Sequence, residues 1–394
     1  MKKKLLIFHQ HDTCVGAGLC LIQIVQALKK NYDITVCLPK NGGNLNNLLI
    51  KEKIKTIYIS GTPVQYSHYN GGYHNFFSLY HIKNIIRIIK NKKIINQIIE
   101  EISPDMILCN SLTLFWIGKI AKKYNIKTCI YIRETYCNTK FNFRTNYLKK
   151  SINNYFDKII AISNYDLNQT SNKKNKNYYK ITDKVDFTLY DDLKKNKCRE
   201  ELNISQDDKI ILYVGGDSKI KGPLVILNAM KYVGNAKLLY LQHYTSKKSF
   251  KNFIKRLLKL DDSYIVEKFI KKNNLEEKII LKSSTNKVEK YFIASDIVVF
   301  PMIIAHQARP VYEAGYARKP IIISDFNNIK EFANEKNVFL FKPGNYNQLA
   351  NTINYIFKNN DNDIIQKIQN NYNNTVNNHN FKTFNKELIN CFND

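Results

Sequence analysis

Residues 298–324 read VVFPMIIAHQARPVYEAGYARKPIIIS, and this stretch decides the fold. An apolar run ends at Phe300, a loop follows, Pro310 suits the first turn of a helix, and a second apolar run fills 321–323. The pattern predicts strand, loop, short helix and strand. It places Glu313 in the first helical turn, near the positive end of the helix dipole. A carboxylate there faces the crevice where open α/β sheets bind ligands.

Two other stretches predict a buried strand, a glycine-containing loop and a helix. The first has a strand at 4–8, a loop at 9–18 and a helix at 19–29, and the second has a strand at 209–214 before the loop GGDSKIKG at 215–222. Glycines let the backbone approach a ligand at a helix start, and the lysines of the second loop suit a diphosphate. In the first loop, a tight turn explains the glycines equally well. The P-loop spacing is absent.

These segments resemble the donor site of retaining glycosyltransferases of family 4, which have the GT-B fold. The matching positions are Val214, Gly215, Lys221, Gly222, Pro301, Glu313, Ala314 and the 320–323 run. The resemblance implies an α/β protein of two Rossmann-like, doubly wound domains facing across a cleft. We expect residues 1–190 to form the acceptor domain and 191–375 the nucleotide-sugar domain. We expect 376–394 to be a helix that crosses back to the first domain.

The resemblance also implies roles for individual residues. Glu313 would hold the ribose and Lys221 the diphosphate, and with His306 they form the predicted catalytic set. The predicted donor-binding residues are Gly16, Gly215, Gly216, Lys219, Lys221, Arg309 and Glu313. The family's first glutamate falls on Ala305 and its arginine on Gly216. We expect His306 to substitute for the former, and Lys219 or Arg309 for the latter.

Four residues are predicted to bind the acceptor. His9 and His11 lie in the first glycine loop, and Arg133 and Glu134 follow the predicted strand 128–132. The stretch around this strand resembles the corresponding part of capsule and O-antigen glycosyltransferases. A structural role for each histidine and an ordinary ion pair at the strand end are the alternatives. Polar residues after successive strands point to one edge of the sheet.

Composition excludes several classes of protein. The chain of 394 residues is long enough for two domains and has no apolar run long enough to span a membrane. The apolar run after Lys4 is only as long as one strand, so we do not expect it to be a secretory signal. Its eight cysteines form no CxxC pair, which argues against a zinc cluster and favours a reducing, cytoplasmic location. The net charge of +28 has two explanations, an AT-rich coding sequence or attraction to anions. No nucleic-acid-binding motif accompanies the charge, so no nucleic acid partner is expected.

The sequence therefore predicts a glycosyltransferase of hexosyl or N-acetylhexosaminyl type that uses a UDP- or GDP-sugar. The expected acceptor is a glycan or lipid-linked molecule of bacterial surface polysaccharide synthesis, such as capsule or lipopolysaccharide, and the family implies retention. No Asp-x-Asp motif stands at a plausible strand end, so neither a metal nor another obligate cofactor is expected. The basic helix predicted at 81–102 has either a solvated polar face or a face that rests on the anionic inner surface of the cytoplasmic membrane. Alternatives are a nucleotide-sugar epimerase of the same fold, a catalytically weak scaffold subunit of a polysaccharide assembly complex, and a basic nucleic-acid binder.

Overall fold

The computed structural model describes residues 2–13, 16–39, 43–59, 66, 69, 72, 77–137, 139–172, 177–243, 262–359 and 361–393. The chain forms two compact units. Unit 1 comprises residues 1–183 and 382–394, and unit 2 comprises residues 184–381. The chain thus passes between the units at Asp183/Lys184 and again at Phe381/Lys382. The sequence prediction placed the first passage after residue 190 and the second after residue 375. The sequence also predicts a loop at 66–77 and a helical region at 249–272. Most of that loop, and residues 249–261 of the helical region, lie outside the described residues.

Unit 1 is built on a parallel sheet of seven strands in the order β3-β2-β1-β4-β5-β6-β7. The strands are β1 (Lys3–Phe8), β2 (Tyr32–Pro39), β3 (Lys55–Ile59), β4 (Met106–Cys109), β5 (Lys127–Ile132), β6 (Lys158–Ala161) and β7 (Tyr178–Lys180). Most of these strands are apolar along their length because helices cover both faces of the sheet. In β1, Leu6 and Phe8 pack into one core and Leu5 and Ile7 into the other.

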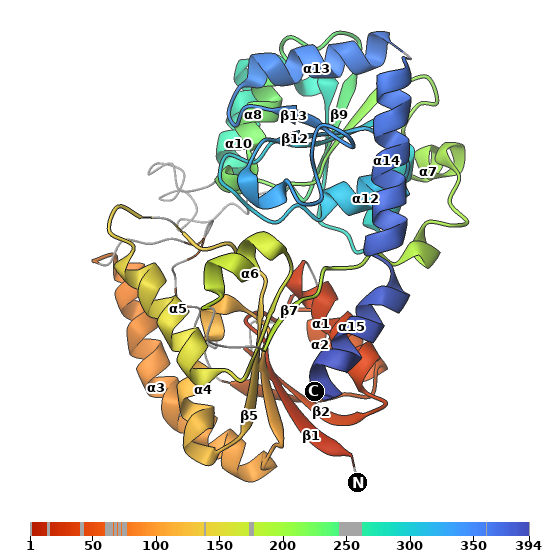
Figure 1. The fold of residues 1–394 in the computed structure, drawn as a ribbon. Coiled ribbons are helices and arrows are strands. Elements are labelled where there is room, and N and C mark those ends of the chain that lie inside the picture. The colour runs from red at the N-terminus through yellow and green to blue at the C-terminus, as the bar shows by residue number, and fades with distance from the viewer. Residues whose placement is uncertain are drawn as a thin grey trace. The chain divides into compact units, whose positions relative to one another are not determined.

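Helices of unit 1 divide between those two cores, as Figure 1 shows. One face carries α3 (Leu79–Ile102), α4 (Trp116–Ala121) and α5 (Phe143–Tyr155), and the other carries α1 (Ala17–Leu28), α2 (Leu45–Lys51) and α15 (Phe381–Asn393). Helix α6 (Asn164–Thr170) and the 3-10 turns η1 (Leu112–Leu114) and η2 (Lys122–Tyr124) complete the unit. Phe384 and Leu388 of α15 are buried in the same core as Leu5 and Ile7 of β1, so the last helix belongs to unit 1.

Unit 2 repeats the design with six parallel strands in the order β10-β9-β8-β11-β12-β13. The strands are β8 (Ile210–Tyr213), β9 (Lys237–Leu241), β10 (Ile279–Lys282), β11 (Ile297–Phe300), β12 (Ile321–Ser324) and β13 (Phe339–Phe341). The predicted fold class is confirmed: each unit is a doubly wound α/β sheet in which the first strand lies inside the sheet.

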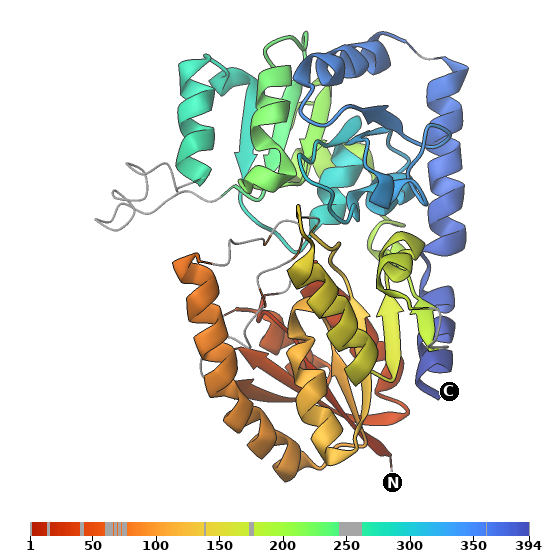
Figure 2. The same cartoon turned by 60° about the vertical axis from the view of Figure 1, so that its left-hand side comes forward.

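The helices of unit 2 also cover both faces of their sheet (Figures 1 and 2). One core includes α7 (Lys195–Glu201), α11 (Val288–Ala294) and α12 (Pro310–Tyr316), and the other includes α8 (Pro223–Ala229), α10 (Asp262–Lys272) and α13 (Tyr346–Lys358). Helix α14 (Asn362–Asn378) packs against α12. The short 3-10 turns are η3 (Phe187–Leu189), η4 (Lys219–Lys221), η5 (Glu276–Lys278) and η6 (Asn327–Ile329).

Three local expectations from the sequence were wrong. The sequence predicted a polar loop over 171–180 and a last strand over 183–189, whereas residues 178–180 form β7 and residues 187–189 form η3. Strand β7 lies at the edge of the sheet beside β6, and its three residues are too few to show an alternating pattern in the sequence. In α3, Ile86 and Ile89 were expected on the same apolar face as Ile95, but they are 47% and 59% exposed.

Candidate functional site

The order of the strands in unit 2 marks one position as a ligand site. Strand β8 has β9 on one side and β11 on the other, so the loops after β8 and β11 leave the sheet in opposite directions. Ligands of open α/β sheets bind where this reversal occurs, at the carboxyl ends of the strands. A Cβ atom on Gly222 would lie 1.8 Å from the backbone oxygen of Pro301, and Gly222 has a positive φ of 74°. Only glycine therefore permits the two loops to approach this closely.

Buried side chains hold the glycine loop after β8 in place. Tyr213 Oη and Tyr240 Oη each donate to the Gly216 carbonyl at 2.8 Å. Gly216 has a φ of 64°, in the left-handed region that favours glycine. A Cβ on Gly215 would meet Tyr213 Oη at 2.2 Å, so this position is also restricted to glycine. Both predicted donor-binding glycines thus shape the backbone, and their contact with a nucleotide stays a prediction.

A second set of contacts anchors the next residue of that loop, and the sequence did not suggest it. Asp217 Oδ1 lies 3.0 Å from Tyr240 Oη, whose one proton it shares with the Gly216 carbonyl, and 2.9 Å from His243 Nδ1. His243 Nε2 lies 3.2 Å from Glu267 Oε1. The hydrogen bond to Asp217 raises the pKa of His243, which favours the imidazolium between the two carboxylates. These residues come from three separate elements, so no local sequence pattern reveals the set.

Lys221 is a half-buried cation in the loop after β8. It is the last residue of η4, and its Nζ lies 5.0 Å from the centroid of the Phe300 ring at the end of β11. Among the residues that the structure describes, no carboxylate pairs with it. Burial lowers the pKa of Lys221 to about 8. Lys219, two residues earlier, is exposed and pairs with Asp262 at 3.3 Å. The two lysines predicted to bind phosphate are therefore in different environments.

His306 lies near Lys221 in the loop after β11. Its Nδ1 is 3.0 Å from the backbone oxygen of Gln307, and a carbonyl only accepts, so Nδ1 carries the proton. Burial and then the charge of Lys221 lower the pKa of His306 to about 3. The ring is consequently neutral, with Nε2 as a hydrogen-bond acceptor. The glutamate that the family has at the position of Ala305 would also accept hydrogen bonds. A neutral His306 can therefore supply the same acceptor, as the sequence analysis expects.

Glu313 and Arg309 form an ion pair at the start of α12. Arg309 Nε donates to Glu313 Oε1 at 3.0 Å, and the Glu313 side chain is 10% exposed. Burial raises the pKa of Glu313, and the charge of Arg309 opposes that shift. Pro310 occupies the first turn and Glu313 lies in it, as predicted. Glu289 of α11 is a second buried carboxylate nearby, since burial and then Glu313 raise its pKa. No sequence pattern marked Glu289.

Unit 1 has its own reversal of strand order between β1 and β4. His9 follows β1, Asn110 follows β4 and Arg133 follows β5, and all three are buried. Asn110 Nδ2 lies 3.0 Å from His9 Nδ1, and Arg133 Nε donates to Asn110 Oδ1 at 2.9 Å. Arg133 Nη1 also pairs with Asp183 at 2.6 Å. Asn110, which the sequence analysis did not assign, therefore joins two of the predicted acceptor residues.

Two hydrogen-bond donors of this network are unsatisfied within the described part of the chain. Because the Asn110 amide nitrogen donates to His9 Nδ1, the proton of the neutral ring lies on Nε2. Burial lowers the pKa of His9 to about 3, with smaller effects from His11 and Arg133, so the ring is uncharged. His9 Nε2 and Arg133 Nη2 are buried and have no hydrogen-bond partner within the described part of the chain. Two unsatisfied donors at one sheet edge suit an anionic or hydroxyl-rich ligand.

The other acceptor-side predictions differ in environment. Glu134 accepts from Ser111 Oγ at 2.5 Å, from Gln10 Nε2 at 3.2 Å and from the Leu112 amide at 2.9 Å. Glu134 therefore holds the loops after β1 and β4, and its contact with an acceptor stays a prediction. His11 is exposed. Gly16, also exposed, precedes α1 with a φ of 47° and a ψ of −106°, a conformation that favours glycine.

Comparison with known proteins agrees with this architecture. Residues 194–375 match the family model described as glycosyl transferases group 1. The chain has the GT-B fold. HepE of Anabaena, solved with UDP and glucose, superposes with a TM-score of 0.77 at 16% identity over 100% of both chains. Sucrose-phosphate synthase of Thermosynechococcus elongatus has a TM-score of 0.76 at 14% identity, covering 100% of this chain and 98% of that one.

A third similar structure is a glycosyltransferase from Rickettsia africae, with a TM-score of 0.71 at 19% identity over 99% of this chain and 98% of that one. No curated protein matches this chain significantly. The family match and the fold together support a glycosyltransferase. Because the structural identities are below 20%, these likenesses establish the fold, and the roles of single residues depend on the geometry described above.

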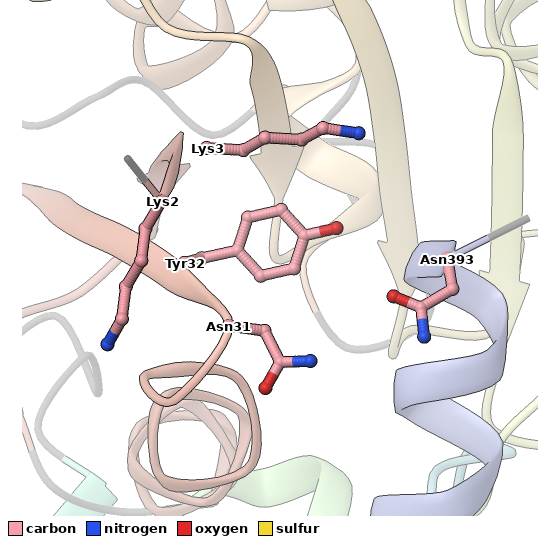
Figure 3. A pocket seen from close by; sticks show the side chains of 5 residues that line it. All are labelled: Lys2, Lys3, Asn31, Tyr32 and Asn393. Atoms are coloured by element: carbon pink, nitrogen blue, oxygen red, sulfur yellow. The ribbon is translucent and has the colours of Figure 1, made fainter.

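One hollow of this GT-B chain lies away from both ligand edges. Figure 3 shows it in unit 1, lined by Lys2, Lys3, Asn31, Tyr32 and Asn393, with a volume of about 590 Å³. Tyr32 Oη donates to the backbone oxygen of Phe392 at 3.0 Å, so the ring helps to hold α15. The hollow is at the amino ends of β1 and β2, opposite the edge that carries His9. We assign it no ligand.

Proposed function

We propose that the chain is a retaining glycosyltransferase of hexosyl or N-acetylhexosaminyl type. It would transfer a sugar from UDP- or GDP-sugar to a glycan or lipid-linked acceptor during bacterial surface polysaccharide synthesis. Two side chains of neighbouring segments carry the proposal: Lys221 follows β8 and pairs with no carboxylate among the described residues, and the buried carboxylate Glu313 follows the adjacent strand β11. A sugar nucleotide offers the complement, a diphosphate and a pair of ribose hydroxyls. The UDP and glucose bound by HepE favour a UDP-sugar as the first donor to test.

The chemistry follows from where charge develops. When the glycosidic bond to the diphosphate breaks, negative charge grows on the leaving phosphate, and a desolvated ammonium placed there stabilises it. Lys221 would supply this charge, Glu313 would fix the ribose, and His306 Nε2 would accept a hydrogen bond from a sugar hydroxyl. On unit 1, His9 Nε2 and Arg133 Nη2 would donate to the acceptor. A neutral His9 with its proton on Nε2 is a donor and not a general base. No protein nucleophile is assigned.

The proposed activity is tested by product analysis. Purified protein is incubated with UDP- and GDP-sugars, with and without polyprenyl-linked or soluble glycan acceptors. We expect nucleotide release coupled to a glycosylated product only when an acceptor is present. Sugar isomerisation without an acceptor would instead identify an epimerase, and tight nucleotide-sugar binding without turnover over a wide acceptor set would identify a scaffold subunit. We propose that no metal is required, so EDTA should leave the rate unchanged.

Nucleotide binding should weaken as pH rises above about 8, because burial places the pKa of Lys221 there. Below that pH the ammonium is charged. Above it, the neutral Lys221 amine must take up a proton before it can bind the fully ionised diphosphate. Affinity for the nucleotide should therefore fall about tenfold per pH unit. Titration calorimetry with UDP or GDP from about pH 7 to about pH 9.5 measures the slope. The Lys221→Arg variant keeps its charge over this range and should give a flat profile; equal slopes in both proteins would contradict the assignment.

His306 should respond to what replaces its acceptor atom. His306→Gln keeps an acceptor oxygen, so kcat/KM should stay within about tenfold of wild type, whereas His306→Phe should lower it about a hundredfold. The Kd for UDP or GDP alone should not change in either variant, because the proposed contact is to the sugar. Equal losses in the two variants, or a parallel loss of nucleotide affinity, would argue for a purely structural histidine.

A further inference from the structure

Helix α3 of unit 1 carries two apolar stripes, and only one of them is buried. Ile88, Ile95 and Ile98 face the core. Leu79, Ile82, Ile86 and Ile89 are 75%, 42%, 47% and 59% exposed. These four residues are three, four and three positions apart, so they share one side of the helix, and that side is opposite the core. Figure 2 shows α3 (orange) at the outer edge of unit 1.

The start of α5 extends this apolar surface. Phe141 and Phe143 are 66% and 76% exposed, and their rings stack with centroids 5.9 Å apart. Arg144 Nη2 of α5 lies 3.2 Å from His81 Nδ1 of α3, which places the first turns of the two helices together (Figure 1). We call Leu79, Ile82, Ile86, Ile89, Phe141 and Phe143 the α3/α5 face. Exposed aliphatic and aromatic groups collected in this way mark an interaction surface.

The charge around the α3/α5 face has a single sign. Lys83, Arg87 and Lys90 are exposed and follow one another at helical spacing beside the apolar stripe. Lys140 precedes Phe141, and its Nζ lies 5.6 Å from the centroid of that ring. Residues 78–99 and 139–156 contain no aspartate or glutamate. A partner must therefore combine an apolar interior with a negative surface.

We infer that the α3/α5 face docks on an anionic phospholipid bilayer. Apolar side chains enter the boundary between head groups and acyl chains while the flanking cations meet lipid phosphates, as in interfacial helices. The chain docks on the surface and does not cross it by the described helices, none of which is long and apolar enough. Helices α3 and α5 follow β3 and β5, so their first turns lie at the carboxyl edge of the sheet that carries His9 and Arg133. If the proposed function holds, docking by the α3/α5 face brings a lipid-linked acceptor to the sheet edge that carries His9 and Arg133.

Flotation with vesicles tests the inference. Wild-type protein should float with phosphatidylcholine vesicles that contain phosphatidylglycerol, and remain unbound with phosphatidylcholine alone. Ile86→Ser/Ile89→Ser should reduce binding about tenfold or more. Ile50→Ser/Ile365→Ser is the matched control, since these isoleucines are 59% and 52% exposed on other helices, and it should bind like wild type.

Charge is tested separately. Lys83→Glu/Arg87→Glu/Lys90→Glu should reduce binding by on the order of a hundredfold. Lys231→Glu/Lys336→Glu/Lys358→Glu makes the same change in net charge at exposed positions of unit 2 and should have little effect. All variants should keep the wild-type thermal shift with UDP or GDP, which separates loss of docking from failure of the proposed donor site.

Three results would overturn the inference. The first is absence of binding to phosphatidylglycerol vesicles at low salt by a wild-type protein that still binds nucleotide. The second is equal losses in the test and control variants. The third is a wild-type dimer that Ile86→Ser/Ile89→Ser dissociates without changing vesicle binding, which would make the α3/α5 face a surface between two copies of the chain.

Discussion

Replacing Lys221 by alanine should lower kcat/KM for sugar transfer by about 10²–10³-fold, the effect of removing one pre-placed electrostatic contact to developing charge. The ammonium is desolvated beside Phe300 and has no acidic partner among the described residues, so its charge is available to a diphosphate. Affinity for UDP or GDP should fall with it. Affinity for the matching nucleoside, which has no phosphate, should stay the same. Steady-state kinetics and nucleotide titration measure the two effects.

Lys219→Ala is the matched control for Lys221→Ala. Both lysines belong to η4, but Lys219 is exposed and paired with Asp262 at 3.3 Å. Exposed ion pairs contribute little, so Lys219→Ala should change kcat/KM by no more than about threefold. If the Lys219 variant lost as much activity as the Lys221 variant, the phosphate assignment would pass to Lys219. If neither lost activity, the diphosphate would have to bind elsewhere.

Replacing Glu313 by alanine should weaken nucleoside and nucleoside diphosphate by the same factor, about 10–100-fold. A carboxylate that accepts two ribose hydroxyls contributes charge-assisted hydrogen bonds of about 1.5–3 kcal/mol each, part of which water recovers. The common factor distinguishes a ribose contact from a phosphate contact, because Lys221→Ala affects the diphosphate alone. Transfer should become undetectable, since a nucleotide displaced by an ångström loses its alignment with Lys221.

Glu313→Gln refines that expectation. The amide keeps the shape of the side chain but loses the charge that pairs with Arg309 at 3.0 Å, so its affinity should lie between wild type and alanine. Glu331→Gln, at an exposed glutamate of the same unit, should behave like wild type. If the folded Glu313→Ala variant bound nucleosides as tightly as wild type, Glu313 would not be the ribose contact. Its ion pair with Arg309 would then have a structural role only.

The sequence was most informative where strands are buried on both faces. The strand that ends at Phe300 and the strand over 321–323 were predicted within one residue of the ends that β11 and β12 have, because unbroken apolar runs fit a sheet that is covered on both faces. Edges were harder. Strand β7 has only three residues and is half-buried, and Ile86 and Ile89 look like core residues until their neighbours are known.

Several residues of the candidate site could be predicted from the sequence, but the contacts between them could not. The glycine loop and Glu313 were visible as motifs, since loop and helix chemistry is local. Asn110 joins His9 to Arg133 across three strands, and the absence of a carboxylate near Lys221 among the described residues is likewise a tertiary property. Glu289 lies on an ordinary amphipathic helix, and only its burial near Glu313 brings it to notice.

The position of α15 governs how the protein can be dissected in the laboratory. Because Phe384, Leu388 and Phe392 complete a core of unit 1, a fragment that stops at Asp183 would expose the apolar surface those side chains cover and should aggregate when expressed. A usable recombinant version of unit 1 needs residues 382–394 restored through a linker. Unit 2 has no such requirement, since residues 184–381 form one uninterrupted segment that can be cloned directly.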